Sequence, residues 1–145
     1  MRALVQRVSS ASVRVDGELV GEIGEGLLVL LGVGQGDRPE QARKLADKIA
    51  RLRIFDGEGG RMDRSLVDLA AGALCISQFT LYGDTRRGLR PSFTEAAEPG
   101  SAERLYEEFC EALAAHRVNV ERGRFGARMS VTLTNEGPVT LLLEA

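Results

Sequence analysis

The sequence has few of the residues that common catalytic and metal sites require. Among 145 residues it contains one histidine, His116, and two cysteines, Cys75 and Cys110. A Ser–His–Asp triad would need His116 beside a serine, but its place at the end of a predicted helix favours an interaction with the helix dipole. The cysteines lie apart in apolar segments, which is typical of reduced core thiols in a cytoplasmic protein. No ligands are spaced for a metal, so we expect no metal and no cofactor.

Long apolar runs and a strong net charge are also missing. No stretch approaches the roughly 18 apolar residues of a membrane span, and residues 1–8 lack the apolar core of a signal peptide. We therefore expect a cytoplasmic protein with no membrane partner. The formal net charge of −2 gives no overall attraction to nucleic acid. No uninterrupted basic helix is present for reading duplex DNA, so we predict no DNA partner, and any RNA contact must use local clusters of arginine.

The length and the 43% of hydrophobic residues predict one domain over residues 1–145. Alternating or apolar segments predict strands, and a helical period predicts two helices. The first helix begins near Pro39, and Ser101 is the expected N-cap of the second. The fold class is mixed α/β, a barrel-like mixed sheet flanked by about two main helices. The predicted strands cover residues 2–15, with a break near Ser9 and Ser10, then 18–23, 27–33, 73–82, 118–121, 130–134 and 139–143.

The stretch 77–82 brings polar groups to the end of a buried apolar run. A strand that delivers hydroxyls beside the basic loop of residues 86–91 suggests a site for a phosphate-bearing substrate. Because side chains alternate between the faces of a strand, Ser77 and Thr80 share a pocket only if the strand bends or bulges between them. N–H groups freed at such a bend can stabilise an oxyanion. The alternative is that both hydroxyls only decorate a strand end.

Gly137 and Pro138 form a second feature, in a predicted turn over residues 135–138. Proline adopts a cis peptide bond more readily than other residues, and glycine lets its backbone approach a ligand closely. An ordinary hairpin turn is the alternative explanation.

Two arginine clusters, at residues 86–90 and 122–128, can hold phosphates or serve as solvated loop charges. Phe93 and Phe125 each follow an arginine-containing loop and can stack on a base or belong to the core. The residues alone leave these alternatives open.

At these positions the chain resembles the D-aminoacyl-tRNA deacylase family, also described as D-tyrosyl-tRNA(Tyr) deacylases. The resemblance covers essentially the whole length and includes residues 1–8, 26–33, 52–55, 90–93 and 123–127. Its most specific parts are two signatures in the same order as in the family. They read Ser77-Gln78-Phe79-Thr80-Leu81-Tyr82 and Asn135-Glu136-Gly137-Pro138-Val139-Thr140.

The resemblance implies a homodimeric barrel that hydrolyses the ester bond of D-aminoacyl-tRNA and of glycine mischarged on alanine tRNA. It implies that Gly137 and Pro138 form a Gly–cis-Pro motif that enters the pocket of the other subunit and rejects L-amino acids. Phe79 and Leu81 would lie near the terminal adenosine of the tRNA acceptor end, and Phe125 would line the same pocket.

The resemblance places catalysis at Ser77, Gln78 and Thr80, whose backbone groups would handle the scissile ester. Thr80 is either a nucleophile or part of a pocket in which the 2′-hydroxyl of the RNA assists. No histidine or lysine lies near Thr80 in the sequence to act as its base. We therefore favour assistance by the RNA together with main-chain stabilisation of the oxyanion. Leu89 stands where the family often has a basic or polar residue, which removes one possible phosphate contact.

Overall fold

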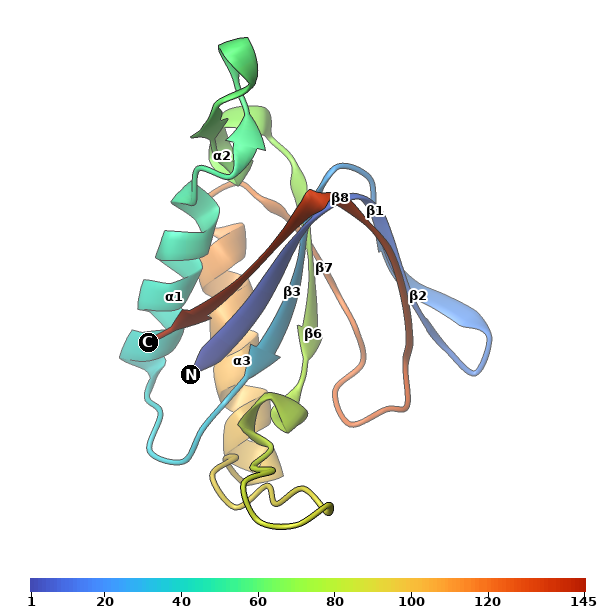
Figure 1. Cartoon of the computed structure of the whole chain (residues 1–145), viewed down its shortest axis with the longest axis vertical. Helices are drawn as coiled ribbons and strands as arrows, with labels where there is room; N and C mark the ends of the chain where they lie inside the picture. Colours follow the sequence, from blue (N-terminus) through green and yellow to red (C-terminus); the bar gives the residue numbers. More distant parts are fainter.

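One long strand carries most of the sheet in the computed structural model, which describes residues 1–145. This strand, β1 (Arg2–Val15), pairs antiparallel with β3 (Gly26–Gly32) through its first half and with β2 (Glu18–Ile23) through its second half. The last strand, β8 (Ser130–Glu144), pairs antiparallel with both halves. Figure 1 shows β1 and β8 side by side, in blue and dark red. The chain's first and last strands are therefore neighbours.

Two parallel strands extend the sheet and curl it. β6 (Gly72–Ser77) lies parallel to β3, and β7 (Asn119–Arg122) lies parallel to β6. The curl brings β2 against β7, where a Cβ atom on Gly21 would lie only 2.9 Å from the carbonyl oxygen of Arg122. A side chain at position 21 would push the two strands apart. The predicted barrel-like mixed sheet is confirmed.

Two helices, α1 (Pro39–Arg51) and α3 (Pro99–Ala114), pack side by side against one face of the sheet (Figure 1). Both present an apolar stripe at helical spacing. The prediction of about two main helices is confirmed. The buried stripe of α1 consists of Ala42, Leu45, Ala46, Ile49 and Ala50. The stripe of α3 consists of Ala102, Leu105, Tyr106, Phe109, Cys110 and Leu113.

Alternation along β6 divides its side chains between two cores. Ala73 and Cys75 belong to the larger cluster under the helices, whereas Leu74 and Ile76 belong to a smaller cluster inside the curl. The period of a strand is two residues, so Ser77 continues the row that faces the helices. Both cysteines are buried and unpaired, as predicted for core thiols.

The connection between α1 and β6 is more regular than the sequence indicates. Ser65 opens a short helix there. Its hydroxyl accepts a hydrogen bond from the N–H of Asp68 (3.3 Å), and the Asp68 carboxylate accepts one from the N–H of Ser65 (2.9 Å). The elements of this connection are β4 (Phe55–Asp56), η1 (Glu58–Gly60), β5 (Met62–Arg64) and α2 (Leu66–Leu69).

The prediction of one strand over residues 73–82 is wrong beyond Ser77. β6 ends there because its parallel neighbour β3 ends at the same level, so a longer strand would have no hydrogen-bonding partner. The chain turns instead into a one-turn 3₁₀-helix, η2 (Phe79–Tyr82). This helix bends the chain between Ser77 and Thr80, as a pocket shared by the two residues would need.

The prediction of a turn at residues 135–138 is also wrong. β8 runs in one direction from end to end, and Gly137 and Pro138 stand in a bulge within it. Opposite residues 6–8, two steps along β1 correspond to five along β8, so residues 136–139 are extruded from the ladder. The peptide bond between Gly137 and Pro138 is cis.

The prediction of Ser101 as a helix N-cap is wrong, because α3 begins earlier and Glu98 is its N-cap. The Glu98 carboxylate accepts a hydrogen bond from the Ser101 hydroxyl (2.7 Å) and from the N–H groups of Ser101 (2.7 Å) and Gly100 (3.1 Å). These bonds, with that of the Ser101 hydroxyl foremost, favour the charged form and lower the pKa of Glu98.

This cap predicts a pH-dependent contribution to stability. A carboxylate whose pKa is lowered by folding stabilises the fold above its unfolded pKa, here 4.5, and loses that contribution as the pH falls through the folded value. At pH 7, urea unfolding of Glu98→Gln should therefore have a lower midpoint than that of the unchanged protein. The two midpoints should converge as the pH falls below the lowered pKa of Glu98 in the folded protein.

The control is Glu103→Gln, which removes an exposed carboxylate from the same helix. It should leave the midpoint unchanged at both pH values. A deficit of Glu98→Gln that stays the same at acidic pH would contradict the assignment of the cap.

Candidate functional site

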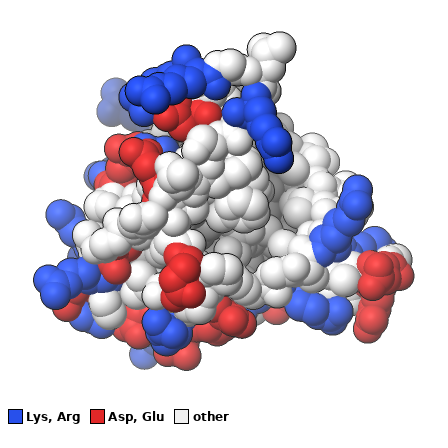
Figure 2. All heavy atoms as spheres, turned by 90° about the horizontal axis from the view of Figure 1, so that it is seen from below, with Lys and Arg blue, Asp and Glu red and all other residues white.

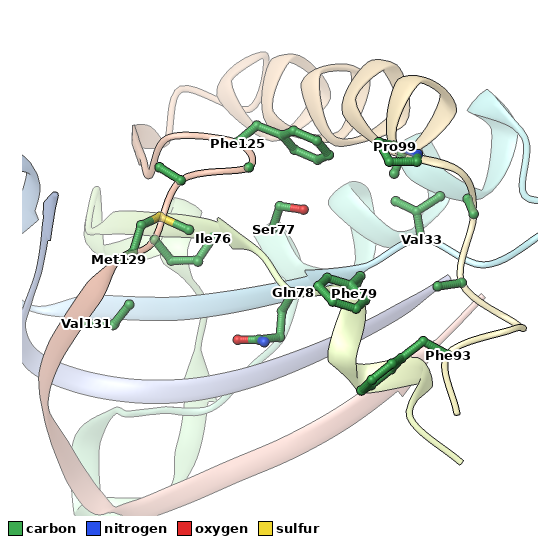
Figure 3. A pocket seen from close by; sticks show the side chains of 15 residues that line it. Val33, Ile76, Ser77, Gln78, Phe79, Phe93, Pro99, Phe125, Met129 and Val131 are labelled. Atoms are coloured by element: carbon green, nitrogen blue, oxygen red, sulfur yellow. The ribbon is translucent and has the colours of Figure 1, made fainter. Parts of the chain in front are cut away.

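A cavity of about 580 Å³ lies where the three parallel strands end (Figure 3). Val33 follows β3, Ser77 ends β6, and residues 125–129 follow β7, while Pro99 opens α3 above them. The carboxyl ends of parallel strands and the amino end of a helix thus form its walls. This is a common position for ligands in α/β folds.

The cavity lining contains no charged side chain and no histidine. Eleven of its 15 residues are hydrophobic, and Ser77 and Gln78 supply the only polar side chains. In Figure 3 the Ser77 hydroxyl points into the cavity, toward the side of Phe125 and Pro99, and the Gln78 amide turns away from it. That amide donates a hydrogen bond to the hydroxyl of Thr80. The side chains therefore offer apolar surface and hydrogen bonds but no activated nucleophile or base.

Main-chain groups at the end of β6 are held firmly beside this cavity. The carbonyl oxygen of Cys75 accepts hydrogen bonds from the Tyr106 hydroxyl (2.7 Å) and the N–H of Gly123 (3.1 Å). Beyond the strand, Phe79 and Thr80 are the first residues of η2, where N–H groups have no partner within the helix. Neither N–H group donates a hydrogen bond to any other backbone carbonyl. Two free donors thus lie at a fixed strand end.

Three phenylalanines give the cavity aromatic surface. The rings of Phe79 and Phe93 meet edge to face with their centroids 5.1 Å apart, and Phe125 lies 6.2 Å from Tyr106. Phe79 is 54% exposed and Phe93 is 37% exposed. Rings that are exposed at the edge of an apolar cavity are available to stack on a nucleobase.

The predicted site residues fall into three groups in the structure. Thr80 and Leu81 lie in η2, next to the cavity but outside its lining; the Leu81 carbonyl accepts a hydrogen bond from Arg2 (2.9 Å). Gly137 and Pro138 lie away from the cavity, in the bulge of β8. The four that line the cavity are Ser77, Gln78, Phe79 and Phe125.

Gly137 and Pro138 occupy the opposite end of the sheet. Their bulge lies beside Val8 of β1. Val8 pairs with Gly26 of β3, and Gly26 pairs with Gly72, the first residue of β6. Ser77 lies five residues further along β6, a distance of about 16 Å at 3.3 Å per residue. In Figure 1 the middle of β8 is at the upper end of the sheet, and the end of β6 is at its lower end. Neither residue reaches the cavity of its own chain.

Arg7, which no sequence motif indicates, holds the bulge in place. Its side chain is almost buried and donates hydrogen bonds to the carbonyl oxygens of Glu136 (3.0 Å) and Ile54 (2.9 Å). Gly137 has a φ of +128°, and a Cβ atom there would lie 3.1 Å from Nη2 of Arg7. Only glycine therefore fits this position without displacing the arginine.

His116 lies far from the cavity. It follows α3, whose first residue, Pro99, lines the cavity, and 16 helical residues span about 24 Å. Its Nε2 lies 3.3 Å from the carboxylate of Asp47 in α1. Within one chain, a triad with Ser77 is therefore excluded. No group of three or more His, Cys, Asp and Glu side chains is placed to hold a metal ion. None of the helices has the length and apolar character needed to cross a membrane.

Sequence reasoning missed part of the apolar lining of the cavity, from two separate segments. Ala96 and Ala97 come from the loop before α3, and Met129 and Val131 come from the chain that enters β8. The only sequence signal for Ala96 and Ala97 is that they form an apolar pair in a largely polar loop. Met129 and Val131 look like ordinary core residues in the sequence.

Two solved structures share this fold. One is named c-Myc DNA Unwinding Element Binding Protein; it is 40% identical, covers 100% of this chain and 99% of its own, and has a TM-score of 0.93. The other is described as a probable eukaryotic D-amino acid tRNA deacylase; it covers 99% of this chain and 98% of its own, with a TM-score of 0.85. At 18% identity the second shows the fold alone. The predicted deacylase-like fold is confirmed.

The sequence narrows this class of fold to one family. A family model described as D-Tyr-tRNA(Tyr) deacylase matches residues 4–144. The D-aminoacyl-tRNA deacylase of Thermosipho africanus is 55% identical over 145 residues, which cover 100% of this chain and 97% of that protein. The chain belongs to the D-Tyr-tRNA(Tyr) deacylase family. The prediction of an enzyme of the hydrolase class is thereby confirmed.

Proposed function

We propose that this protein hydrolyses the ester between a D-amino acid and the 3′-terminal adenosine of a tRNA, and that a second copy of the chain completes each active site. Family membership supports the reaction, since its relatives are named D-aminoacyl-tRNA deacylases. Glycine mischarged on alanine tRNA is a second substrate, because glycine has no side chain for the site to reject. The enzyme acts in the cytoplasm, where aminoacyl-tRNA is used, and residues 1–145 act as one domain.

The observation that carries the need for a second copy is the place of Gly137 and Pro138. Both are exposed, and they lie about 16 Å, measured along the strands, from the cavity of their own chain. A role for them in rejecting L-amino acids therefore requires that they enter the cavity of a partner. There the carbonyl oxygens of both residues accept hydrogen bonds from the substrate's ammonium group.

The free edge of β8 supports a homodimer. β8 pairs only with β1, so its outer edge leaves the peptide groups of a 15-residue strand without a strand partner. On this strand Leu141 is 40% exposed and Leu142 is 55% exposed. Soluble proteins cover long apolar edge strands, because such edges otherwise pair without control. A second copy packed here covers the edge and brings each bulge toward the other chain.

The neutral cavity supports catalysis by the substrate and the main chain. In the proposed reaction, water attacks the ester carbonyl carbon, the bond to the ribose 3′ oxygen breaks, and that oxygen receives a proton from the water. The lining offers no histidine, carboxylate or amine to move this proton, so the 2′-hydroxyl of the terminal ribose relays it. The free N–H groups of Phe79 and Thr80 are the donors for the oxyanion. Ser77 and Gln78 hold the ester beside them.

The aromatic surface supports binding of the tRNA acceptor end. Phe79 and Phe125 stack against the terminal adenosine, and Leu81, in the same turn of η2 as Phe79, lies near it. Side chains of this kind bind a base by its faces and are indifferent to the amino acid. Discrimination between enantiomers is therefore left to Gly137 and Pro138 of the second copy.

The direct test is hydrolysis of two matched substrates. The purified protein should release tyrosine from D-tyrosyl-tRNA and leave L-tyrosyl-tRNA intact under the same conditions. Release is measured as acid-soluble labelled amino acid over time. Equal rates on the two enantiomers, or no release from the D form, would rule out the proposed function.

The role of Thr80 has a separate test. If the RNA assists, Thr80→Ala removes only a hydroxyl that accepts a hydrogen bond from Gln78, and kcat on D-tyrosyl-tRNA should fall less than about tenfold. Loss of a general base or nucleophile costs about 10²–10⁴-fold. A loss of that size in a stably folded variant would show that Thr80 takes part in the chemistry. The matched control is Thr85→Ala, in the exposed loop beyond η2.

The sharing of sites between two chains predicts rescue on mixing. Gly137→Ala strains the bulge against Arg7, and Ala127→Trp fills the cavity, so each variant alone should be impaired. After mixing with exchange of subunits, half of the sites in each mixed dimer combine an intact cavity with an intact bulge. Random pairing then restores roughly a quarter of the sites.

Recovery is measured on D-tyrosyl-tRNA against each variant incubated alone. If the bulge served its own chain, every site would carry one of the two changes, and mixing would restore nothing. That result would contradict the shared site without affecting the assigned reaction.

A further inference from the structure

A small hairpin with a basic tip projects from the edge of the cavity. The main-chain groups of Asp84 and Ser92 exchange two hydrogen bonds, of 2.7 and 2.9 Å, and so close the loop of residues 85–91. The hairpin is anchored at the cavity, because the next residue, Phe93, lines it and packs on Phe79. Its tip has arginines at positions 86, 87 and 90.

The arginines of this hairpin are not equivalent. The guanidinium of Arg86 binds the Asp84 carboxylate through two contacts, of 2.9 and 2.8 Å. The hydrogen bond from that guanidinium is the main reason that the pKa of Asp84 falls to about 2. Arg87 and Arg90 are exposed and make no hydrogen bond or ion pair. One arginine therefore shapes the hairpin, and two are free.

The loop after β7 repeats this division on another side of the cavity. Arg122 forms an ion pair with Glu107 of α3. Arg124 and Arg128 are exposed and their side chains have no partner, although the residues between them, Phe125 to Ala127, line the cavity. Two free arginines thus flank the cavity lining here as well.

The rest of the cavity rim differs in charge. Glu95 and Glu98 flank the lining residues Ala96 and Ala97, just before α3. Figure 2, which views the molecule from the end where β6 stops, shows an uncharged hollow with Lys and Arg gathered on parts of its rim and Asp and Glu on others. With a net charge of −2 for the whole chain, the positive part of the rim is a local feature.

We propose that Arg87, Arg90, Arg124 and Arg128 bind the phosphates of the single-stranded RNA that leads to the terminal nucleotide in the cavity. This inference rests on the proposed function, since it assigns the path of the same substrate. The carboxylates before α3 repel phosphate, so the strand leaves the cavity over the two arginine-bearing loops. Free guanidinium groups bind phosphate through two parallel hydrogen bonds without first breaking an ion pair.

The test compares a substrate that carries phosphates with one that carries none. The first is D-tyrosyl-tRNA, and the second is adenosine esterified with D-tyrosine at the ribose. For each, kcat/KM is measured between 50 and 200 mM salt for the unchanged protein and for the double variants Arg87→Gln/Arg90→Gln and Arg124→Gln/Arg128→Gln. Each phosphate contact makes binding fall by about threefold over this range of salt.

Each double variant should therefore lower the ratio of kcat/KM on the tRNA to kcat/KM on the adenosine ester. For the tRNA, the fold-decrease in kcat/KM between 50 and 200 mM salt should also be about tenfold smaller than for the unchanged protein. The control is Lys44→Gln/Lys48→Gln, which removes two exposed charges from α1, a helix that contributes nothing to the cavity. That variant should keep both the ratio and the salt dependence.

Leu89 allows the opposite experiment. It is fully exposed between the two free arginines of the hairpin. Leu89→Arg should raise kcat/KM on the tRNA about threefold at 200 mM salt and steepen the salt dependence, with no gain on the adenosine ester.

The outcomes separate this inference from the function on which it rests. If neither D substrate is cleaved, the proposed function fails. If both are cleaved but the arginine variants keep the salt dependence of the unchanged protein, or lose activity equally on both substrates, the assignment of these arginines to phosphates is overturned.

Discussion

The antiparallel pairing of β1 with β8 is the constraint on which the arrangement of this protein depends. It ties together the two ends of the chain over the longest strands of the sheet. It also contains the register shift that extrudes Gly137 and Pro138, since a bulge exists only relative to a continuous partner strand. Arg7 projects from β1 and binds the carbonyl of Glu136. The strand that forces the bulge out of the ladder thus also fixes its position.

This pairing separates the two halves of the proposed active site. The cavity forms where β3, β6 and β7 end, and the bulge lies near the level where β3 and β6 begin. The length of a strand is rigid, so no local movement closes a gap of about 16 Å. A twofold arrangement along the free edge of β8 solves this problem without flexible parts. Such an arrangement makes the unpaired edge a component of the site.

The sequence predicts those parts of the fold that depend on local patterns. The hairpin at Asp16 and Gly17, with positive φ at both residues, and the helix opened by Pro39 have signals of this kind. The end of β6 has no such signal, because it depends on where β3 stops. The Gly137–Pro138 bulge also has no local sequence signal, because the same residues suit a turn. Only the pairing of β8 with β1 shows that they form a bulge instead.

The candidate site divides in the same way. Ser77, Gln78, Phe79 and Phe125 line the cavity, as the family resemblance implies, but the residues alone leave their roles open. The alanine pair before α3 is defined only by what surrounds it in space. Arg7 is hidden for a similar reason, since its partners Ile54 and Glu136 are main-chain carbonyls that leave no pattern in the sequence.

The distribution of charge follows from the task proposed for this site. A carboxylate inside the cavity would attract the ammonium group of either enantiomer, and its long-range attraction would weaken the effect of shape. An arginine inside would repel that group. Main-chain carbonyls act only at hydrogen-bonding distance and in a narrow range of directions, so they fix the position of the amino group and leave rejection to steric contact. Charges that attract RNA then belong on the rim, where Arg87 and Arg124 are exposed. On the proposed function, the uncharged interior and the arginines outside it are two parts of one arrangement, in which electrostatics would bring the substrate and shape would select it.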